Sequence, residues 1–431
     1  MHNKSIRRAW LLAALAVLAP GAAYAQGIAE DYAPADPVLP FPLYSTHPEA
    51  GGLFTFGEFV IYRQTNPLKS QLVAQRGLVI TSPTVPDPTN TFLVQVPGVT
   101  DSGTFVGSGQ EALDVNQVRG RSGWEPGFKI GVGWKFASGS SVSIDWLHLI
   151  DGHVSAAATL APSGSRVGNN FAESFLYSNV FNFPSDYGGP PNKITVPNPQ
   201  FRQFGPLNSV INPPPFIPAP GAVFGIWNGA SIETIEFTQR FDQYNLTFRQ
   251  PIYETETYRL SGLVGPRLSW IWQRFAWRAT DLDTDGNSGP QFQALYTNDV
   301  SNRLYGGHAG FSNECYLGHG VAVNFEVEGA LYADVVKELA KYELARGGFG
   351  PENKRARTVV VPVPEVDATL GLLWSPVEGI EVHAGYNIKS FFNTVSSPQP
   401  IDFNYGRLDP RFEQSTIRFF DGFDLGVAFI F

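Results

Sequence analysis

The C-terminal residues 423–431 constrain the fold more than any other segment. Large apolar side chains fill every second position, namely Phe423, Leu425, Val427, Phe429 and Phe431. The positions between them are Asp424, Gly426, Ala428 and Ile430, which are small or charged except for Ile430. Successive side chains of a strand point to opposite faces, so the pattern predicts a strand with one apolar face. Two structures accommodate such a strand: a membrane barrel, or the edge of a soluble sandwich.

The N-terminal residues favour export. A basic start with Arg7 and Arg8 precedes an apolar run from Trp10 to about Ala19 and the sequence Ala23-Tyr-Ala25. These are the three parts of a signal peptide, so we predict that residues 1–25 are removed. Residues 26–52 are proline-rich and are expected to be a periplasmic segment. The mature chain has no run of about 18 apolar residues, the length that a membrane helix needs.

Residues 124–136 give the clearest internal strand. One face would carry Trp124, Pro126, Phe128, Ile130, Val132, Trp134 and Phe136, and the other face Glu125, Gly127, Lys129, Gly131, Gly133 and Lys135. At about 3.3 Å per residue the two tryptophans are roughly 33 Å apart along the strand. A tilt of about 40° reduces this to near 25 Å along the membrane normal, the height of the apolar band of a transmembrane barrel.

The same alternation recurs along the rest of the chain, and the connections differ in length. Short turns are expected near residues 138, 252, 319 and 377, and long links at 64–123, 150–230, 275–302, 336–361 and 390–417. This asymmetry is typical of outer-membrane barrels, with the short turns periplasmic and the long loops extracellular. We therefore predict that residues 53–431 form one all-β, antiparallel up-and-down barrel of about ten strands. Weak runs at 78–81, 92–96 and 292–296 make twelve the nearest alternative, and residues 333–346 have the composition of a short loop helix.

The export signal and the spacing of the aromatic residues indicate that the apolar faces contact lipid. The opposite faces then line the lumen with groups of both signs: Glu125, Lys129, Lys135, Asp145, Arg249, Arg259, Arg267, Glu326, Glu328, Asp367, Glu381, His383, Lys389 and Asp424. A ten- to twelve-stranded barrel lies between the filled interior of eight strands and the open channel of sixteen. These charges therefore either line a narrow pore for ions or small solutes, or form an ion-paired network that plugs a non-conducting structural or surface-interaction barrel.

The chain resembles the outer-membrane β-barrel family abundant in planctomycete-type bacteria and the related pore-forming major outer-membrane proteins of Legionella type. The resemblance is carried by residues 127–134, 143–146 and 260–272 and by the terminal phenylalanine strand. It implies an integral outer-membrane protein, pore-forming, with an undefined substrate. It also implies that Phe431 and the alternating apolar residues before it are an assembly signal, with outer-membrane lipid and the barrel-assembly machinery as partners.

Residues 281–286 resemble the start of a calcium loop. Asp281, Asp283 and Asp285 stand at alternate positions before Gly286, as in the D-x-D-x-D-G pattern. The glutamate expected at the twelfth position is replaced by Phe292. A calcium site and an ordinary polar loop both fit this segment, and no other cofactor is expected.

Other functional classes find little support. A formal net charge of −9 argues against a nucleic-acid partner, and the single cysteine, Cys315, excludes a disulfide framework. Asp151 and His153 could share a face near the barrel mouth, so a surface hydrolase is a remote alternative. We predict that the protein is not an enzyme; the sequence leaves its oligomeric state open.

Overall fold

The computed structural model describes residues 52–80, 85–86, 93–94, 104–106, 108–119, 123–159, 176–180, 226–227, 229–280, 288–344, 352–377, 379–404 and 414–431. The predicted signal peptide, most of the periplasmic segment and the three aspartates of the calcium-like loop lie outside these residues. Their assignments stay predictions.

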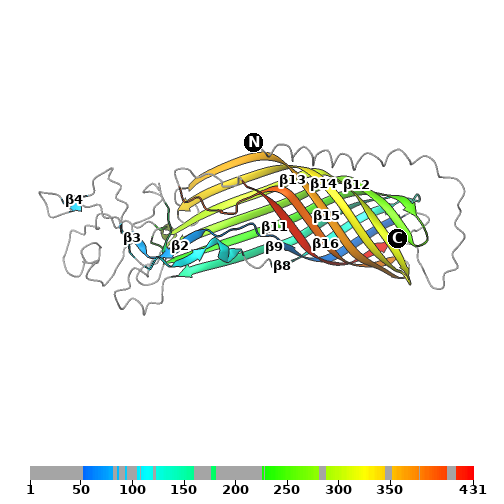
Figure 1. Ribbon diagram of the computed structural model, residues 1–431, viewed down its shortest axis with the longest axis horizontal. Coiled ribbons are helices and arrows are strands. Elements are labelled where there is room, and N and C mark those ends of the chain that lie inside the picture. The colour runs from blue at the N-terminus through cyan, green and yellow to red at the C-terminus, as the bar shows by residue number, and fades with distance from the viewer. Residues whose placement is uncertain are drawn as a thin grey trace, which may run out of the picture. The chain divides into compact units, whose positions relative to one another are not determined.

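Ten antiparallel strands close into one barrel (Figure 1). They are β1 (Gly52–Gln64), β8 (Trp124–Lys135), β9 (Ser141–Thr159), β11 (Ile232–Glu254), β12 (Tyr258–Thr280), β13 (Gln293–Gly318), β14 (Val321–Leu344), β15 (Glu352–Val377), β16 (Ile380–Ser396) and β17 (Gln414–Ile430). The predicted fold and the strand number of ten are confirmed. Twelve is wrong: the weak runs near 78 and 92 contribute β3 (Leu78–Ile80) and β5 (Leu93–Val94) to small two-stranded sheets, and residues 293–296 begin β13.

Closure is made by the first and last strands. β1 pairs with β17 from Phe54–Ile430 to Gln64–Phe420, and its other edge pairs with β8. The backbone of Phe431 also donates a hydrogen bond to the carbonyl of Leu53. No edge is therefore left between the two ends of the sheet in the lipid-facing region, which is what a barrel in a membrane requires.

The two ends of the barrel differ. Turns 136–140, 255–257, 319–320 and 378–379 lie at one end, hereafter the turn end, together with Gly52 and Phe431. The strand ends that are joined by residues 65–123, 160–231, 281–292, 345–351 and 397–413 lie at the other end, the loop end. Gly318, His319 and Gly320 all have positive φ, the conformation that lets such a short turn reverse the chain.

The strands at the loop end are longer than we expected. β11 to β15 contain 23 to 26 residues, against about 9–11 needed to cross a bilayer. The helix predicted from residue 333 is wrong, because Ala333–Leu344 pair with β13 throughout and continue β14. Cross-strand hydrogen bonding and an alternating buried face override the helical composition there. No helix among the described residues is long and apolar enough to span a membrane.

Alternation of burial shows which faces point outward. On the lipid-facing side, Ile130, Leu246, Phe325, Leu370 and Leu425 are exposed, while their neighbours in sequence are more buried. This apolar band ends part-way up each strand, where the outward residues become Arg240, Arg274, Asp299 and Lys337. The barrel therefore continues beyond the band at the loop end.

Described parts of the long connections pack inside the loop end. The sheet β10-β2-β7 (Leu176–Tyr177, Leu72–Arg76, Glu111–Asp114) and the 3-10 helix η1 (Val115–Val118) pack with residues of the inner wall in one apolar core. Residues 395–402 also cross this space, because the backbone carbonyls of Pro400 and Asp402 accept hydrogen bonds from Tyr296 and Tyr342. We call these packed segments the loop-end plug.

We expect Ile130→Arg to destabilise the membrane-inserted barrel by about 2–4 kcal/mol, because it places a cation in the middle of the apolar band. Ile417→Arg is the matched control, since Ile417 also points outward but lies beyond the ion pair of Arg63 with Asp421. Urea titration of both variants refolded in vesicles measures the difference. Equal stability of the two variants would contradict this placement of the band.

Candidate functional site in the barrel lumen

The twelve charged residues predicted to face the lumen all lie on the inward side of their strands. They are Lys129, Lys135, Asp145, Arg249, Arg259, Arg267, Glu326, Glu328, Asp367, Glu381, Lys389 and Asp424, each buried or half-buried. Glu125 and His383 are half-buried on the same faces. Whether any of these groups contacts a solute stays a prediction.

Arg267 is the centre of a buried ion network. Its guanidinium contacts Glu328, and its Nη1 lies 3.6 Å from Glu365 and 3.7 Å from Asp367. Lys389 also contacts Asp367, and the hydroxyl of Tyr332 donates to Glu365. These groups come from β12, β14, β15 and β16, so the network ties one half of the wall together. Each charge is compensated by its partners, as a buried charge must be.

A second group of ion pairs lies nearer the turn end. Arg249 lies 3.0 Å from Glu326 and 3.6 Å from Glu314, and Arg259 lies 3.3 Å from Glu314 and 2.9 Å from Glu254. Because Arg249 is on β11 and Glu326 on β14, their pair bridges strands that are not neighbours. Mixed charge thus fills this part of the lumen with side chains paired to one another.

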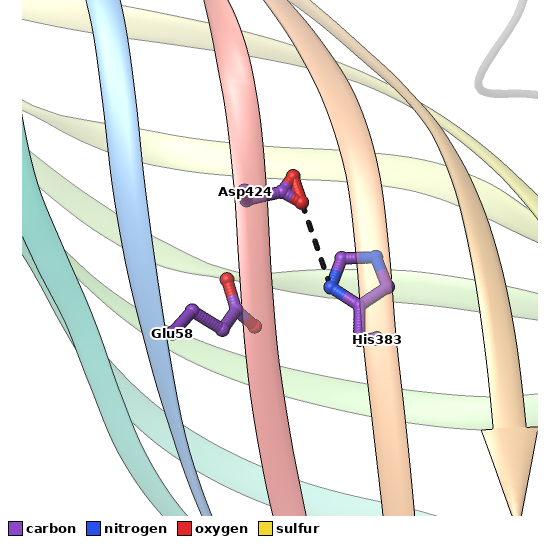
Figure 2. Close-up of side chains that lie close together, drawn as sticks. All are labelled: Glu58, His383 and Asp424. Atoms are coloured by element: carbon purple, nitrogen blue, oxygen red, sulfur yellow. Dashed lines mark ion pairs between the residues drawn. The ribbon is translucent and has the colours of Figure 1, made fainter.

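Glu58, His383 and Asp424 form the one group of three or more potential metal ligands found among the described residues (Figure 2). Their nearest donor atoms lie within 4.8 Å of one another, and Nδ1 of His383 is 3.5 Å from Oδ1 of Asp424. Two carboxylates and an imidazole suit a divalent transition metal. However, Nζ of Lys129 lies 3.7 Å from Glu58 and already supplies a positive charge there.

An aromatic cluster crosses the lumen above the ion pairs. The ring of Phe241 lies 4.5 Å from that of Phe420 and 6.0 Å from that of Phe391, measured between centroids. Phe391 and Phe420 are 5.7 Å apart. Since β11 lies opposite β16 and β17 in the ring of strands, these side chains meet from opposite walls. All three are fully buried.

The three rings belong to a continuous apolar layer, which we call the septum. It comprises Val60, Tyr62, Leu147, Leu149, Phe241, Ile271, Leu304, Ala330, Tyr332, Val363, Phe391 and Phe420. Nine of the ten barrel strands contribute, all except β8. Immediately beyond it, Arg418 of β17 donates to Gln273 of β12 across the lumen, at 2.9 Å. The described lumen is therefore closed by side chains at this level.

Glu233 holds the loop-end plug to the wall. Nε1 of Trp277 donates to its Oε2 at 2.9 Å, and Oγ of Ser178 lies 3.0 Å from both carboxyl oxygens. Burial raises the pKa of Glu233 to about 8. Ser178 also donates to the carbonyl of Val73 at 2.6 Å, so a protonated Glu233 can in turn donate to the serine oxygen.

The alternation of the sequence does not predict every residue of the lumen. It assigns no role to Glu58 or Glu365, and it does not predict the septum. The available signal was parity: Phe241 has the same inward parity as Asn245 and Arg249 on β11. An apolar residue on a polar face indicates a side chain that contacts the opposite wall.

Asp151 and His153, the candidate residues of a surface hydrolase, lie on β9 and point to the outside of the barrel beside β11. The carboxylate of Asp151 accepts two hydrogen bonds from Arg240, at 2.8 and 2.6 Å. Nδ1 of His153 lies 3.2 Å from Oγ1 of Thr238. Each side chain thus has a separate partner, and the structure does not join the two in a catalytic pair.

Removal of Arg267 should leave Glu328 and Glu365 buried without a cationic partner, whereas Asp367 keeps Lys389. We expect Arg267→Ala to lower the free energy of unfolding by about 3–5 kcal/mol. Lys341→Ala breaks the partly exposed pairs with Glu343 and Glu352, and should cost less than about 1 kcal/mol. Denaturant titration of both variants tests this, and a cost for Arg267→Ala no larger than that of the control would contradict the network.

Docking of the plug should weaken as pH rises. The ordinary pKa of a glutamate is 4.5, whereas that of Glu233 is about 8 in the folded protein, so the folded state retains its proton longer. The contribution of Glu233 to the free energy of unfolding is therefore fully present below pH 4.5. It falls as the pH rises from 4.5 to about 8, by up to about 1.4 kcal/mol per pH unit. Denaturation across this window measures the slope. Glu233→Gln should remove most of it, and an unchanged slope would contradict the assignment.

Comparison with known proteins places this barrel in a family. Among solved structures, the chain is similar to the outer membrane protease OmpT from Escherichia coli, with 7% identity over 88% of this chain and 97% of that chain and a TM-score of 0.37. It is also similar to the monoaromatic hydrocarbon channel CymD, with 9% identity over 89% of both chains and a TM-score of 0.24. A Pseudomonas aeruginosa FadL homologue gives 7% identity over 88% of this chain and 90% of that chain, with a TM-score of 0.20. Likeness at these TM-scores says nothing about activity.

A search of curated proteins found no match. The family model described as Legionella pneumophila major outer membrane protein precursor, in contrast, matches residues 97–431. That match includes nine of the ten strands of the barrel, from β8 to β17. The chain therefore belongs to the Legionella major outer membrane protein family of β-barrels.

Proposed function

We propose that this protein is an integral outer-membrane barrel that is closed at rest and serves as a structural and surface-presenting element. The observation that carries the proposal is the septum, in which Phe241, Phe391 and Phe420 meet from opposite walls. The loop-end plug closes the lumen a second time. Family membership supports the location in the outer membrane.

The orientation follows from the connections. Short turns of transmembrane barrels face the periplasm and long loops face outward, so both ends of the barrel sequence lie on the periplasmic side. The predicted signal peptide would deliver the chain there, and the terminal strand with Phe431 would direct its assembly. The long connections then become the surface that the cell presents to its surroundings.

Closure at the septum has a physical basis. An ion that passes an apolar layer must lose part of its hydration shell without gaining a replacement, and apolar constrictions in channels block conduction by excluding water. The septum is made of fully packed rings, and the next layer toward the turn end is the ion network around Arg267. A hydrated ion therefore has no continuous aqueous path through this state.

A narrow pore for ions or small solutes is the second candidate. It is favoured by the charges of both signs between the septum and the turn end, including Lys135, Glu326 and Glu381, which are only half-buried. In that case the septum is the gate, and conduction requires the three rings to separate. The surface hydrolase gains no support from Asp151, whose carboxylate is engaged by Arg240.

Planar-bilayer recording of the refolded protein separates the two candidates. We expect the wild-type protein to be silent and the variant with Phe241→Ala, Phe391→Ala and Phe420→Ala to conduct, because it removes the rings that meet in the lumen. The matched control changes three outward phenylalanines, Phe248, Phe325 and Phe423, to alanine. It removes the same side-chain volume and should stay silent.

Steady conductance of the wild-type protein would overturn the closed barrel in favour of the pore. Silence of the triple septum variant, with normal insertion shown by heat-modifiable gel migration, would show that the septum is not what closes the lumen.

A further inference from the structure

A band of basic and aromatic side chains lies on the outer wall of the barrel. The strand registers place Arg240, Trp272, Ser301, Lys337 and Thr358 in one row across β11 to β15. The neighbouring row toward the turn end contains Trp270 and Arg303, which are cross-strand partners. These residues all have outward parity, so they face away from the lumen.

The cations and the rings are in contact. The guanidinium of Arg303 lies 4.9 Å from the ring of Trp270, and that of Arg240 lies 5.6 Å from the ring of Trp272. Nε1 of Trp270 is held by Oγ of Ser301 at 3.2 Å. These contacts fix the cations beside the flat faces of the indoles.

The two rows border a surface pocket of about 400 Å³. Its lining includes the basic and aromatic residues Arg240, Trp270, Trp272, Arg303, Lys337 and Arg357, together with two acidic residues, Asp299 and Glu338. We call this pocket and its rim the interfacial patch. Its volume is in the range of sites that hold a small molecule or a head group.

Arg303 and Lys337 have no acidic partner within the described part of the chain. Arg240 is paired with Asp151, and Arg274, just above the patch, is paired with Asp299. Neither Arg303 nor Lys337 forms an ion pair with a described residue, and Nε of Arg303 is buried without a hydrogen-bond partner. The patch therefore has positive charge to offer a ligand.

The patch lies where the apolar band ends. Toward the turn end, the outward residues of the same strands are Leu268, Tyr305 and Leu331, all exposed. Toward the loop end the outward residues are Arg274 and its cross-strand partner Asp299, which lies at the edge of the pocket. Tryptophan at such a boundary is typical of a membrane interface, since its ring is apolar and its N–H is polar.

We propose that the interfacial patch binds an anionic lipid through a phosphate-bearing head group, with its acyl chains along the apolar outer face of β12 to β14. Arginine is suited to phosphate because its donors form a planar fork, and Lys337 adds a point charge. An acidic soluble protein fits less well, because the exposed side chains of Leu268, Tyr305 and Leu331 beside the patch form an apolar wall suited to acyl chains. The proposal rests on the outer-membrane location given above and is independent of whether the lumen conducts.

The test is lipid binding to the refolded full chain in detergent micelles, measured by native mass spectrometry. Phosphatidylglycerol is the anionic probe, phosphatidylcholine the zwitterionic one, and inorganic phosphate the soluble one. We expect phosphatidylglycerol to bind more tightly than phosphatidylcholine. Each cation near an anionic surface raises the affinity about fivefold. The double variant Arg303→Gln, Lys337→Gln should therefore weaken the affinity for phosphatidylglycerol by about 25-fold.

The control is the pair Arg278→Gln and Lys354→Gln, which removes the same net charge from the loop end outside the pocket. It should leave phosphatidylglycerol binding within about twofold of wild type, as expected for charges screened by distance. Three results would overturn the proposal: equal affinity for the two lipids, an equal loss of phosphatidylglycerol affinity in the patch and control double variants, or displacement of the lipid by inorganic phosphate. Heat-modifiable migration confirms folding, and Lys337→Gln alone, with an expected loss of about fivefold, decides the matter if the double variant does not fold.

Discussion

The requirement that every backbone N–H and C=O be paired inside a bilayer governs this structure. Lipid offers no hydrogen bonds, so a sheet that crosses it must close on itself. Here closure depends on a single seam, between β1 and β17, in which residues near the start of the described chain meet residues at its very end. Residues 423–431 alternate between apolar and small or charged side chains because one face of the closing strand contacts lipid and the other faces the interior.

Closure determines what the interior must do. Ten strands enclose too little space for a wide aqueous channel and too much for one layer of small side chains. The lumen resolves this with three layers: ion pairs toward the turn end, the septum of Phe241, Phe391 and Phe420, and the loop-end plug. In the first layer the charged groups are mostly paired with one another, and in the septum the apolar groups pack together. The result is a barrel that is stabilised through its lumen as well as through its wall.

The outer wall shows a different adaptation. The apolar band stops at Trp270 and Trp272, and the strands continue beyond it with polar faces. Just beyond the apolar band, this extension carries the basic residues Arg240, Arg303 and Lys337. Family membership is consistent with this arrangement.

Local alternation was sufficient to predict the barrel, its ten strands and the inward direction of the charged residues, because a period of two is fixed by the geometry of a strand and by the contrast between lipid and lumen. The same reasoning failed at the loop end, where residues 333–344 continue a strand although their composition favours a helix. Only the tertiary structure decided which residues meet across the lumen. The contact of Phe241 with Phe420, and of Arg267 with Glu365, depends on barrel diameter, stagger and side-chain length, and no pattern within one strand encodes the distance to the opposite wall.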